Sequence, residues 1–349
     1  MAVSNVKKER HSGMELLRIM AMALVVLTHT DFWALGTPMS QMCATDMARA
    51  AYQYYMEFIS IICVNCFVFI SGWFSIKPTV KGFANLVFQI LFYNIVIYVI
   101  AALVGYTSWG FGSFVTHLNV FVHWFLAAYV ALYLISPVLN LFIEHAGKRQ
   151  AMVTVGAFVA LDVLMGWTQD YLYFMGGYSL LHFMVIYLIA RYIKVFGGKL
   201  FTLDKKWDAA IYLLITIVSP ALLVASYYVA PGIWHYASLL FWYNNPLVII
   251  MSVYFCLFFT KLSFRSRMVN FVGASSFAVY LIHTDTLVRD WCITDYSRSN
   301  FFSHDLLHFT GAVVLLIVAL FVVAVIADQV RQWLWSLIQS RFFSAGTHN

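Results

Sequence analysis

Two ionisable residues, Arg18 and His29, lie eleven positions apart in the first apolar segment of the chain. Eleven residues at about 100° each complete roughly three helical turns, so both side chains point to one helix face, roughly 16 Å apart along the axis. Arginine is a permanent cation that suits phosphate, and imidazole can accept and return a proton near neutral pH. The pair therefore predicts anion binding at one depth and proton transfer at another. The structural alternative is that Arg18 reaches lipid headgroups and His29 caps a neighbouring helix.

Further polar side chains occur in apolar surroundings, where an ionisable group costs at least ~2.5 kcal/mol and calls for a function or a partner. Near the depth of His29 we expect Glu57, a second catalytic candidate that could orient the imidazole or could simply lie among lipid headgroups. The substrate-binding candidates expected at this depth are His123, Trp124, Asn244, Asn245 and His283. Near the depth of Arg18 we expect residues that could help to hold an anionic cofactor, namely Ser71, Lys77, Lys81 and Arg191. These residues include no HxxxH or HxxE pair, so a metal site is not predicted.

The elements that must position these residues are membrane-spanning helices. Of the 349 residues, 62% are apolar and 10% are charged, whereas soluble domains carry about 25% charged residues. The composition excludes a soluble globule, and runs such as 87–104 and 311–327 lack the alternation of barrel strands. Since a span needs roughly 20 residues, we predict an all-α polytopic membrane protein of about ten spans, with residues 1–349 forming a single membrane domain. The spans are expected near residues 15–34, 57–75, 82–105, 123–143, 150–166, 177–196, 208–230, 238–260, 274–293 and 306–335.

The lysines and arginines predict the orientation of these spans. With ten spans, all of the 21 basic residues except Arg49, Arg289 and Arg298 fall on the side that holds both termini. Positive residues favour the cytoplasmic side, so both termini are predicted to be cytoplasmic. The basic residues are scattered over several loops, a pattern that gives no support for nucleic-acid binding.

Proline and cysteine positions add local expectations. Pro246 predicts a break in the eighth span, because proline removes a backbone hydrogen bond. The five cysteines form neither a disulfide framework nor a zinc pattern, and Cys63 and Cys66 are expected to pack as small residues. Cys43 and Cys292 fall in predicted outer loops, where a bridge in an oxidising compartment is left open.

Five segments, taken in order, resemble motifs of the membrane acyltransferase-3 family. Arg18 and His29 are similar to the R-x10-H motif that opens that family, and Cys66-Phe-Val-Phe-Ile-Ser-Gly72 resembles its FF(I/L)SG motif. The family's WFL…Y…Y…P helix is matched by His123-Trp-Phe-Leu126 with Tyr129, Tyr133 and Pro137. Two later motifs of the family are matched by Tyr243-Asn-Asn-Pro246 and by Ser275-Ser-Phe-Ala-Val-Tyr-Leu-Ile-His283. The ordered set extends from residue 15 to residue 283 over the ten predicted spans.

The resemblance implies an activity and its partners. Members of that family transfer acyl groups, usually acetyl from acetyl-CoA, to carbohydrates or related acceptors at the cytoplasmic membrane, and many modify bacterial surface or secreted polysaccharides. The resemblance implies that Arg18 and His29 are required, with His29 as the base, and that the nearest likeness is the stand-alone form without an extracellular hydrolase-like domain. The expected partners are acyl-CoA, a carbohydrate or lipid-linked glycan acceptor and membrane lipids, while a homo-oligomer is left open.

The spacing and the resemblance combine in one hypothesis. The head group of acyl-CoA stays cytoplasmic and is held by Arg18, its acyl arm extends toward His29, and His29 deprotonates the acceptor hydroxyl. Serine or tyrosine hydroxyls or Asn245 could stabilise the oxyanion, and direct transfer and an acyl-enzyme both stay open. The competing class is a ten-span transporter or flippase of a polar or glycan-linked solute. Such proteins often show paired broken helices, whereas only the break at Pro246 is visible in this sequence.

Overall fold

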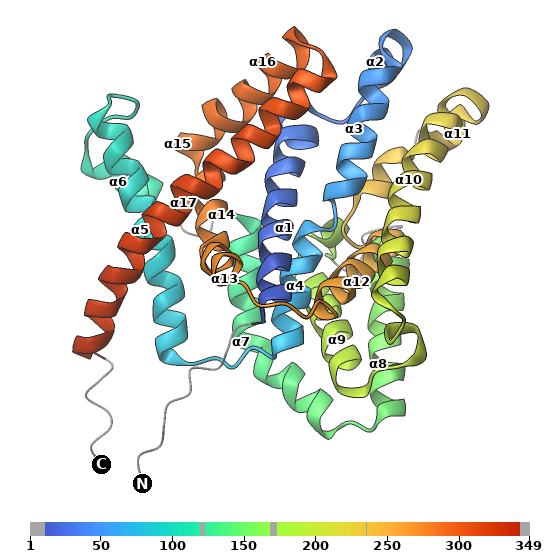
Figure 1. Ribbon diagram of the computed structural model, residues 1–349, viewed down its shortest axis with the longest axis horizontal. Helices are drawn as coiled ribbons and strands as arrows, with labels where there is room; N and C mark the ends of the chain where they lie inside the picture. The colour runs from blue at the N-terminus through green and yellow to red at the C-terminus, as the bar shows by residue number, and fades with distance from the viewer. Residues whose placement is uncertain (1–10, 119–122, 168–172, 235, 343–349) are drawn as a thin grey trace.

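The chain forms helices and no strands in the part that the computed structural model describes, which is residues 11–118, 123–167, 173–234 and 236–342 (Figure 1). The apolar runs noted in the sequence become long helices that are packed side by side. The prediction of an all-α polytopic membrane protein is confirmed.

The helices follow one another through short connections. The α-helices are, in chain order, α1 (Ser12–Thr28), α2 (Ser40–Thr45), α3 (Met47–Ser60), α4 (Cys63–Phe74), α5 (Val80–Leu103), α6 (Phe111–His117), α7 (Trp124–His145), α8 (Lys148–Leu161), α9 (Leu180–Phe196), α10 (Lys205–Val229), α11 (Pro231–Trp234), α12 (Pro246–Thr260), α13 (Arg267–Ala274), α14 (Ser276–His283), α15 (Thr286–Arg289), α16 (Tyr296–Ser303) and α17 (Leu306–Phe342). The π-helical turns are η1 (His29–Trp33), η3 (Asp162–Trp167) and η7 (Asp290–Asp295), and the 3-10 turns are η4 (Met175–Gly177), η5 (Lys199–Phe201) and η6 (Ala237–Phe241).

Short polar side chains fix where several of these helices begin. The side chains of Thr79, Ser179 and Asp204 accept hydrogen bonds from backbone N–H groups in the first turns of α5, α9 and α10. Asn245 does the same at α12, whose first residue is Pro246. Proline fits the first helical position because its missing N–H would have no partner there. The predicted break at Pro246 is therefore a helix start that follows η6.

Eight helical segments of the described residues are long and apolar enough to cross a membrane, and a bent pair would make a ninth. With that pair, nine of the ten predicted spans have a counterpart, and α9 lies at the tenth, 177–196, but is shorter than the others. It has 17 residues, or roughly 26 Å at 1.5 Å per residue, against a hydrocarbon core of about 30 Å. In Figure 1, α9 nevertheless returns the chain between α8 and α10, so the alternation of directions is retained.

The predicted span at 274–293 is not one straight helix. The bent pair consists of Arg267–His283 and Thr286–Ser303, which meet at an angle of 77°. Asp285 causes the restart, because its side chain accepts a hydrogen bond from Leu287 N at 2.9 Å and so caps α15. A hydropathy average over a whole span does not detect this break, since apolar residues such as Leu281, Ile282, Leu287 and Val288 continue on both sides of it.

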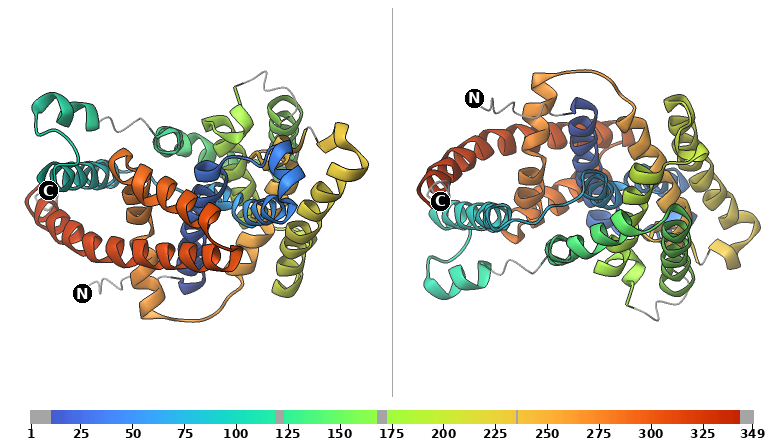
Figure 2. Two further views of the ribbon diagram at one scale, coloured as in Figure 1. Left: turned by 90° about the horizontal axis from the view of Figure 1, so that it is seen from above. Right: turned by 90° about the horizontal axis from the view of Figure 1, so that it is seen from below.

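Helices α1 and α4 form the centre of the molecule. Helix α4 packs against α1, α9 and α12, and α1 also packs against α3, α13 and α14. Figure 2 shows α1 near the middle of the assembly, with α5 and α17 extending to one side and α10 and α11 to the other. Polar residues on α1 and α4 are thus placed inside the protein, away from lipid.

The connections between helices divide between two sides of the molecule. In Figure 1 the turns α4–α5, α7–α8 and α9–α10 lie at the lower side, together with the start of α1 and the end of α17. The turns α10–α11 and α16–α17 and the short helix α2 lie at the upper side. Residues 1–10 and 343–349 lie outside the described residues, so which side is cytoplasmic stays a prediction.

Candidate active site

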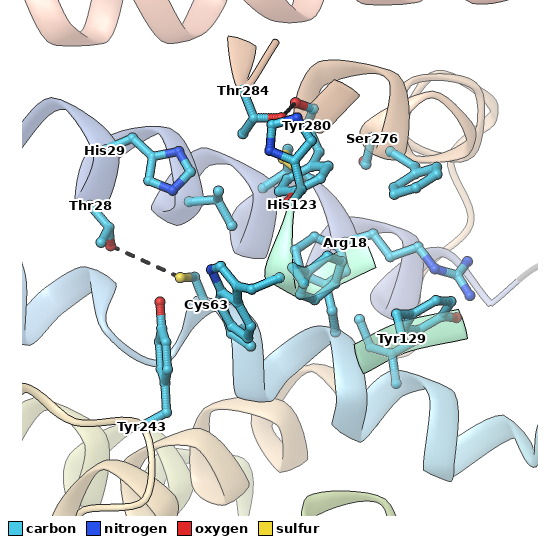
Figure 3. A pocket seen from close by; sticks show the side chains of 18 of the residues that line it. Arg18, Thr28, His29, Cys63, His123, Tyr129, Tyr243, Ser276, Tyr280 and Thr284 are labelled. Carbon is cyan, nitrogen blue, oxygen red and sulfur yellow. Dashed lines mark hydrogen bonds between the residues drawn. The ribbon is translucent and has the colours of Figure 1, made fainter. Parts of the chain in front are cut away.

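A cavity of about 1090 Å³ lies between α1, α3, α4, α7, α13 and α14. Figure 3 shows Arg18 and His29 at opposite ends of the group of labelled side chains, with Cys63 and His123 between them. The prediction that both residues of the first helix face one space agrees with this lining. Six of the twelve predicted site residues line the cavity, namely Arg18, His29, Glu57, Ser71, His123 and Trp124.

The Arg18 end of the cavity carries an oriented cation. A guanidinium nitrogen of Arg18 lies 2.5 Å from Oε1 of Glu15, one helical turn earlier. The Glu15 side chain is 5% exposed and that of Arg18 is 33% exposed. The guanidinium also lies over the Phe74 ring, 5.7 Å from its centroid. Arg18 is thus held from one side and accessible from the other, an arrangement that can bind an anion bidentately.

Glycine at position 273 permits this arrangement. A Cβ built there would lie 2.8 Å from Oε2 and 2.9 Å from Cβ of Glu15. Helix α13 can therefore approach α1 closely only because residue 273 has no side chain. The contact closes the cavity beside Arg18.

The His29 end of the cavity carries a histidine pair. Nδ1 of His29 lies 2.9 Å from Nε2 of His283, which is fully buried on α14. The His29 ring also contacts Trp33, with ring centroids 4.4 Å apart. His29 is the first residue of η1, where the α-helix widens into a π turn, a feature frequent at functional sites. The sequence interpretation gave His283 a role in substrate binding, whereas the structure places it against His29.

Glu57 lines the cavity but does not hold His29. No hydrogen bond joins the two side chains in the described part of the chain, so the prediction that Glu57 orients the imidazole is not met; His283 occupies that place instead. Glu57 is 3% exposed, and its Oε2 has no hydrogen-bond partner among the described residues. One turn away, Nε2 of Gln53 donates to Oδ1 of Asp31 at 3.1 Å. Two carboxyl groups are thus buried at this end.

Aromatic rings form much of the wall between the two ends. The Trp124 ring centroid lies 4.6 Å from that of Tyr178 and 5.9 Å from that of Tyr243. Ser71 Oγ donates to the carbonyl oxygen of Phe67 at 2.9 Å and lies 3.1 Å from Tyr129 Oη. The wall therefore offers flat apolar surfaces with hydroxyl groups at their edges, which suits a thin ligand with both apolar and polar atoms.

Three predicted cations lie away from the cavity. Lys77 and Lys81 are exposed on and after the α4–α5 turn. Arg191 is buried on α9, where its guanidinium lies 3.6 Å from Glu144. The sequence order placed them near the depth of Arg18, but depth alone does not specify the direction of a side chain.

Asn244 and Asn245 also lie behind the cavity wall, where their side chains form hydrogen bonds mainly with backbone groups. Nδ2 of Asn245 donates to the carbonyl oxygen of Leu240 at 3.1 Å, and its Oδ1 caps α12. Nδ2 of Asn244 lies 3.3 Å from both the carbonyl oxygen and Oδ1 of Asp162. The structure therefore does not bring these asparagines to the site as the sequence interpretation expected.

Asp162, His182 and Asn65 form a fully buried chain of hydrogen bonds that joins α9 to α4. His182 Nδ1 lies 2.7 Å from Asp162 Oδ2, and its Nε2 lies 2.9 Å from Asn65 Oδ1. Nδ2 of Asn65 donates to the carbonyl oxygen of Tyr243 at 3.0 Å. This chain fixes the backbone of Tyr243, whose ring lines the cavity.

A second, smaller cavity of about 540 Å³ lies beside the first, between α5, α6 and α15. The two cavities share His123 as a lining residue. Almost all the side chains that line the second cavity are polar, namely Asn94, Tyr98, Thr107, Ser113, Thr116, His117, His123, Asp285 and Thr286, with Leu287 as the exception. Nε2 of His117 lies 3.2 Å from Asp285 Oδ2 at this site.

A family model described as an acyltransferase domain matches residues 11–328. The match covers most of the 349 residues, including every predicted site residue. The chain belongs to this acyltransferase-3 family. The protein is accordingly a membrane acyltransferase, which favours that class over the transporter alternative. No curated protein and no solved structure matches the chain significantly.

Several residues of this acyltransferase line the cavity but were not among the predicted site residues, although Tyr243, Ser276 and Tyr280 belong to the motif segments quoted from the sequence. They include Cys63, Tyr178, Tyr243, Ser276, Tyr280 and Arg289. Cys63 Sγ lies 3.9 Å from Thr28 Oγ1, and all five cysteines are free. The i,i+3 spacing of Glu15 and Arg18 is a signal in the sequence for the contact between these two residues at the site. Among the described residues, no group of three or more histidine, cysteine, aspartate and glutamate side chains could hold a metal ion.

Proposed function

We propose that this acyltransferase moves an acyl group, in the simplest case acetyl, from acyl-CoA to a hydroxyl of a carbohydrate acceptor. The acceptor would be a surface polysaccharide, an exopolysaccharide or a lipid-linked precursor, and the reaction would take place at the cytoplasmic membrane of a bacterium. The observation that carries the proposal is that one cavity, the larger of the two described, has Arg18 at one end and His29 at the other (Figure 3).

The shape and chemistry of the cavity support acyl-CoA as the donor. Acyl-CoA has a phosphate-bearing head, a long thin arm and a thioester at the end of that arm. Arg18 offers a partly exposed guanidinium to phosphate, and the aromatic wall offers apolar contacts to the arm. The eleven residues from Arg18 on α1 to His29 at the start of η1 rise by roughly 16 Å at 1.5 Å per residue, which is of the same order as an extended pantetheine.

His29 supplies the proton transfer in this proposal. It accepts the proton of the acceptor hydroxyl as the hydroxyl oxygen bonds to the acyl carbon. It then returns that proton to sulfur as the carbon–sulfur bond breaks, so the products are an ester and the free thiol of CoA. The hydroxyl of Ser276 also lines the cavity, but Ser276 begins α14 whereas His283, which contacts His29, ends it, so Ser276 lies toward the Arg18 end (Figure 3).

The second cavity supports a hydroxyl-rich acceptor. Its lining of hydroxyl, amide, imidazole and carboxylate groups is what several sugar hydroxyls require. His123 lies between it and the larger cavity, so an acceptor bound there would present a hydroxyl toward the cavity that His29 lines. In this arrangement donor and acceptor enter separate spaces and meet near the histidine pair.

The decisive variant is His29→Ala in the purified, full-length protein. We expect acceptor-dependent release of free CoA thiol to fall by about 100- to 10,000-fold, the usual contribution of a general base, while acyl-CoA binding and thermal unfolding stay unchanged. The matched control is His145→Ala, because His145 is exposed at the end of α7 and does not line the cavity. Full activity in the folded His29→Ala protein would show that the assigned base is wrong.

Cys63→Ala separates the two chemical routes. Direct transfer to the acceptor predicts near-normal activity, whereas a thioester on Cys63 would require the thiol, since this cysteine lines the same cavity. Complete loss of activity in the folded variant would contradict direct transfer. A carrier without chemistry would release no CoA thiol in any variant.

A further inference from the structure

A hydrogen bond joins His283 to His29, and its donor and acceptor can be assigned. The rings lie with their centroids 5.1 Å apart, and His29 Nδ1 is 2.9 Å from His283 Nε2. His283 Nδ1 lies 2.6 Å from the carbonyl oxygen of Val279, one turn earlier on α14. A carbonyl oxygen only accepts hydrogen bonds, so the proton of His283 is on Nδ1.

This assignment determines the tautomer of His29. A neutral histidine with its proton on Nδ1 has a lone pair on Nε2, so His283 Nε2 must accept and His29 Nδ1 must donate. The lone pair of neutral His29 is then on its own Nε2. That nitrogen has no hydrogen-bond partner among the described residues, and His29 lines the large cavity, so the lone pair is available to a substrate proton.

We propose that His283 is a positioning residue that holds His29 in the tautomer with the proton on Nδ1, so that Nε2 is the base of the acyl transfer. The inference rests on the proposed function only for the identity of the base. The backbone carbonyl of Val279 fixes the direction of both hydrogen bonds, because a carbonyl oxygen accepts hydrogen bonds and cannot donate them. When His29 accepts a proton, its bond to His283 becomes charge-assisted and so strengthens.

A neutral partner distinguishes this pair from a carboxylate–histidine pair. Buried carboxylates line or border the same space, yet none forms a hydrogen bond with His29 in the described part of the chain. His283 is fully buried and packs against Tyr280, with ring centroids 6.1 Å apart. It therefore acts from behind the reacting imidazole and does not touch the substrate.

Two substitutions test this role in the full-length protein. His283→Leu removes the acceptor, and we expect kcat to fall by roughly 10- to 100-fold, the range typical when the group that orients a metal-bound histidine is removed. The KM for acyl-CoA should stay unchanged because Arg18 is remote. His283→Gln places an amide oxygen where it can accept from His29 Nδ1, and we expect it to recover most of kcat. If both variants fold and Gln is no better than Leu, the inference is overturned.

Histidine nitrogen NMR supplies a readout that a merely structural role would not move. With ¹⁵N-labelled histidine, the signals lost in His29→Ala identify His29, and we expect a protonated Nδ1 and an unprotonated Nε2 in the wild type. His283→Leu should give a mixture of tautomers at His29. A wild-type His29 protonated on Nε2 would overturn the inference even if His29→Ala abolishes activity, whereas an active His29→Ala protein would overturn the proposed base instead.

Discussion

At the residue scale, the chemistry of Arg18 depends on Glu15. The nearly buried carboxylate of Glu15 reduces the net positive charge at this end of the cavity, but it fixes the direction in which the Arg18 guanidinium points. The guanidinium has five N–H donors, so the contact with Glu15 leaves others for a ligand. Arg18 thus acts through the geometry of its donors as much as through its charge, and lysine cannot reproduce that geometry.

Arg18→Ala should therefore weaken the binding of acyl-CoA more than it slows the chemical step. Hydrogen bonds to charged groups contribute about 1.5–3 kcal/mol, so we expect the KM for acyl-CoA to rise by roughly 10- to 100-fold with a smaller change in kcat. Arg18→Lys should recover only part of the loss. The measurement is initial-rate kinetics of CoA release over a range of acyl-CoA concentrations.

Lys77→Ala is the matched control for that experiment. Lys77 is a cation that the sequence places at a similar depth, but it is exposed and outside the cavity. Its KM for acyl-CoA should equal that of the wild type. An equal rise in KM for both variants would indicate a diffuse positive surface and would contradict a specific anion site at Arg18.

At the scale of elements, two glycines bring the helices of the site together. A Cβ at Gly72 of α4 would lie 2.5 Å from the carbonyl oxygen of Tyr187 on α9, and Gly273 has a similar relation to Glu15 on α1. Small residues let helix backbones approach closely inside membranes, where packing is a main source of association energy. Gly72 is therefore a packing residue that sets the position of one cavity wall.

Gly72→Ala should destabilise the protein because the contact involves backbone that cannot move away locally. Overpacking typically costs about 1–3 kcal/mol, and we expect a lower midpoint of thermal unfolding in detergent. Gly156→Ala is the matched control, since a Cβ at this exposed position of α8 meets nothing within 4 Å. That control should be neutral or slightly stabilising because alanine favours helices; equal destabilisation of the two variants would contradict the packing role.

At the scale of the whole molecule, composition and helical spacing predicted the class of fold and one face of the site. The shared face of Arg18 and His29 follows from the period of a single helix, and the cavity lining agrees with it. The pairing of His29 with His283 could not be predicted, because the two residues are 254 positions apart and no local period relates them. For the same reason depth alone misplaced Lys77 and Asn245, whose directions depend on turns and caps.

The span count shows the corresponding limit for the fold. Hydropathy located the apolar segments, but it could not show that Asp285 restarts a helix or that α9 is too short to match the membrane thickness. These features depend on side-chain capping and on packing among helices. The alternation of sides is retained in spite of both departures, since the turns α4–α5, α7–α8 and α9–α10, which carry several basic residues, lie together at the lower side of Figure 1.

That alternation allows the predicted orientation to be tested for the whole molecule. Positive residues favour the cytoplasm, so the lower side should face it. We expect a membrane-impermeant thiol reagent to label Ser40→Cys and Gly232→Cys in intact cells, since both positions are exposed and belong to α2 and α11 at the upper side. Lys148→Cys and Lys205→Cys, exposed at the lower turns, should be labelled only after the membrane is permeabilised. Labelling in the reverse order would place Arg18 at the outer face, away from cytoplasmic acyl-CoA, and would refute the proposed path from donor to acceptor.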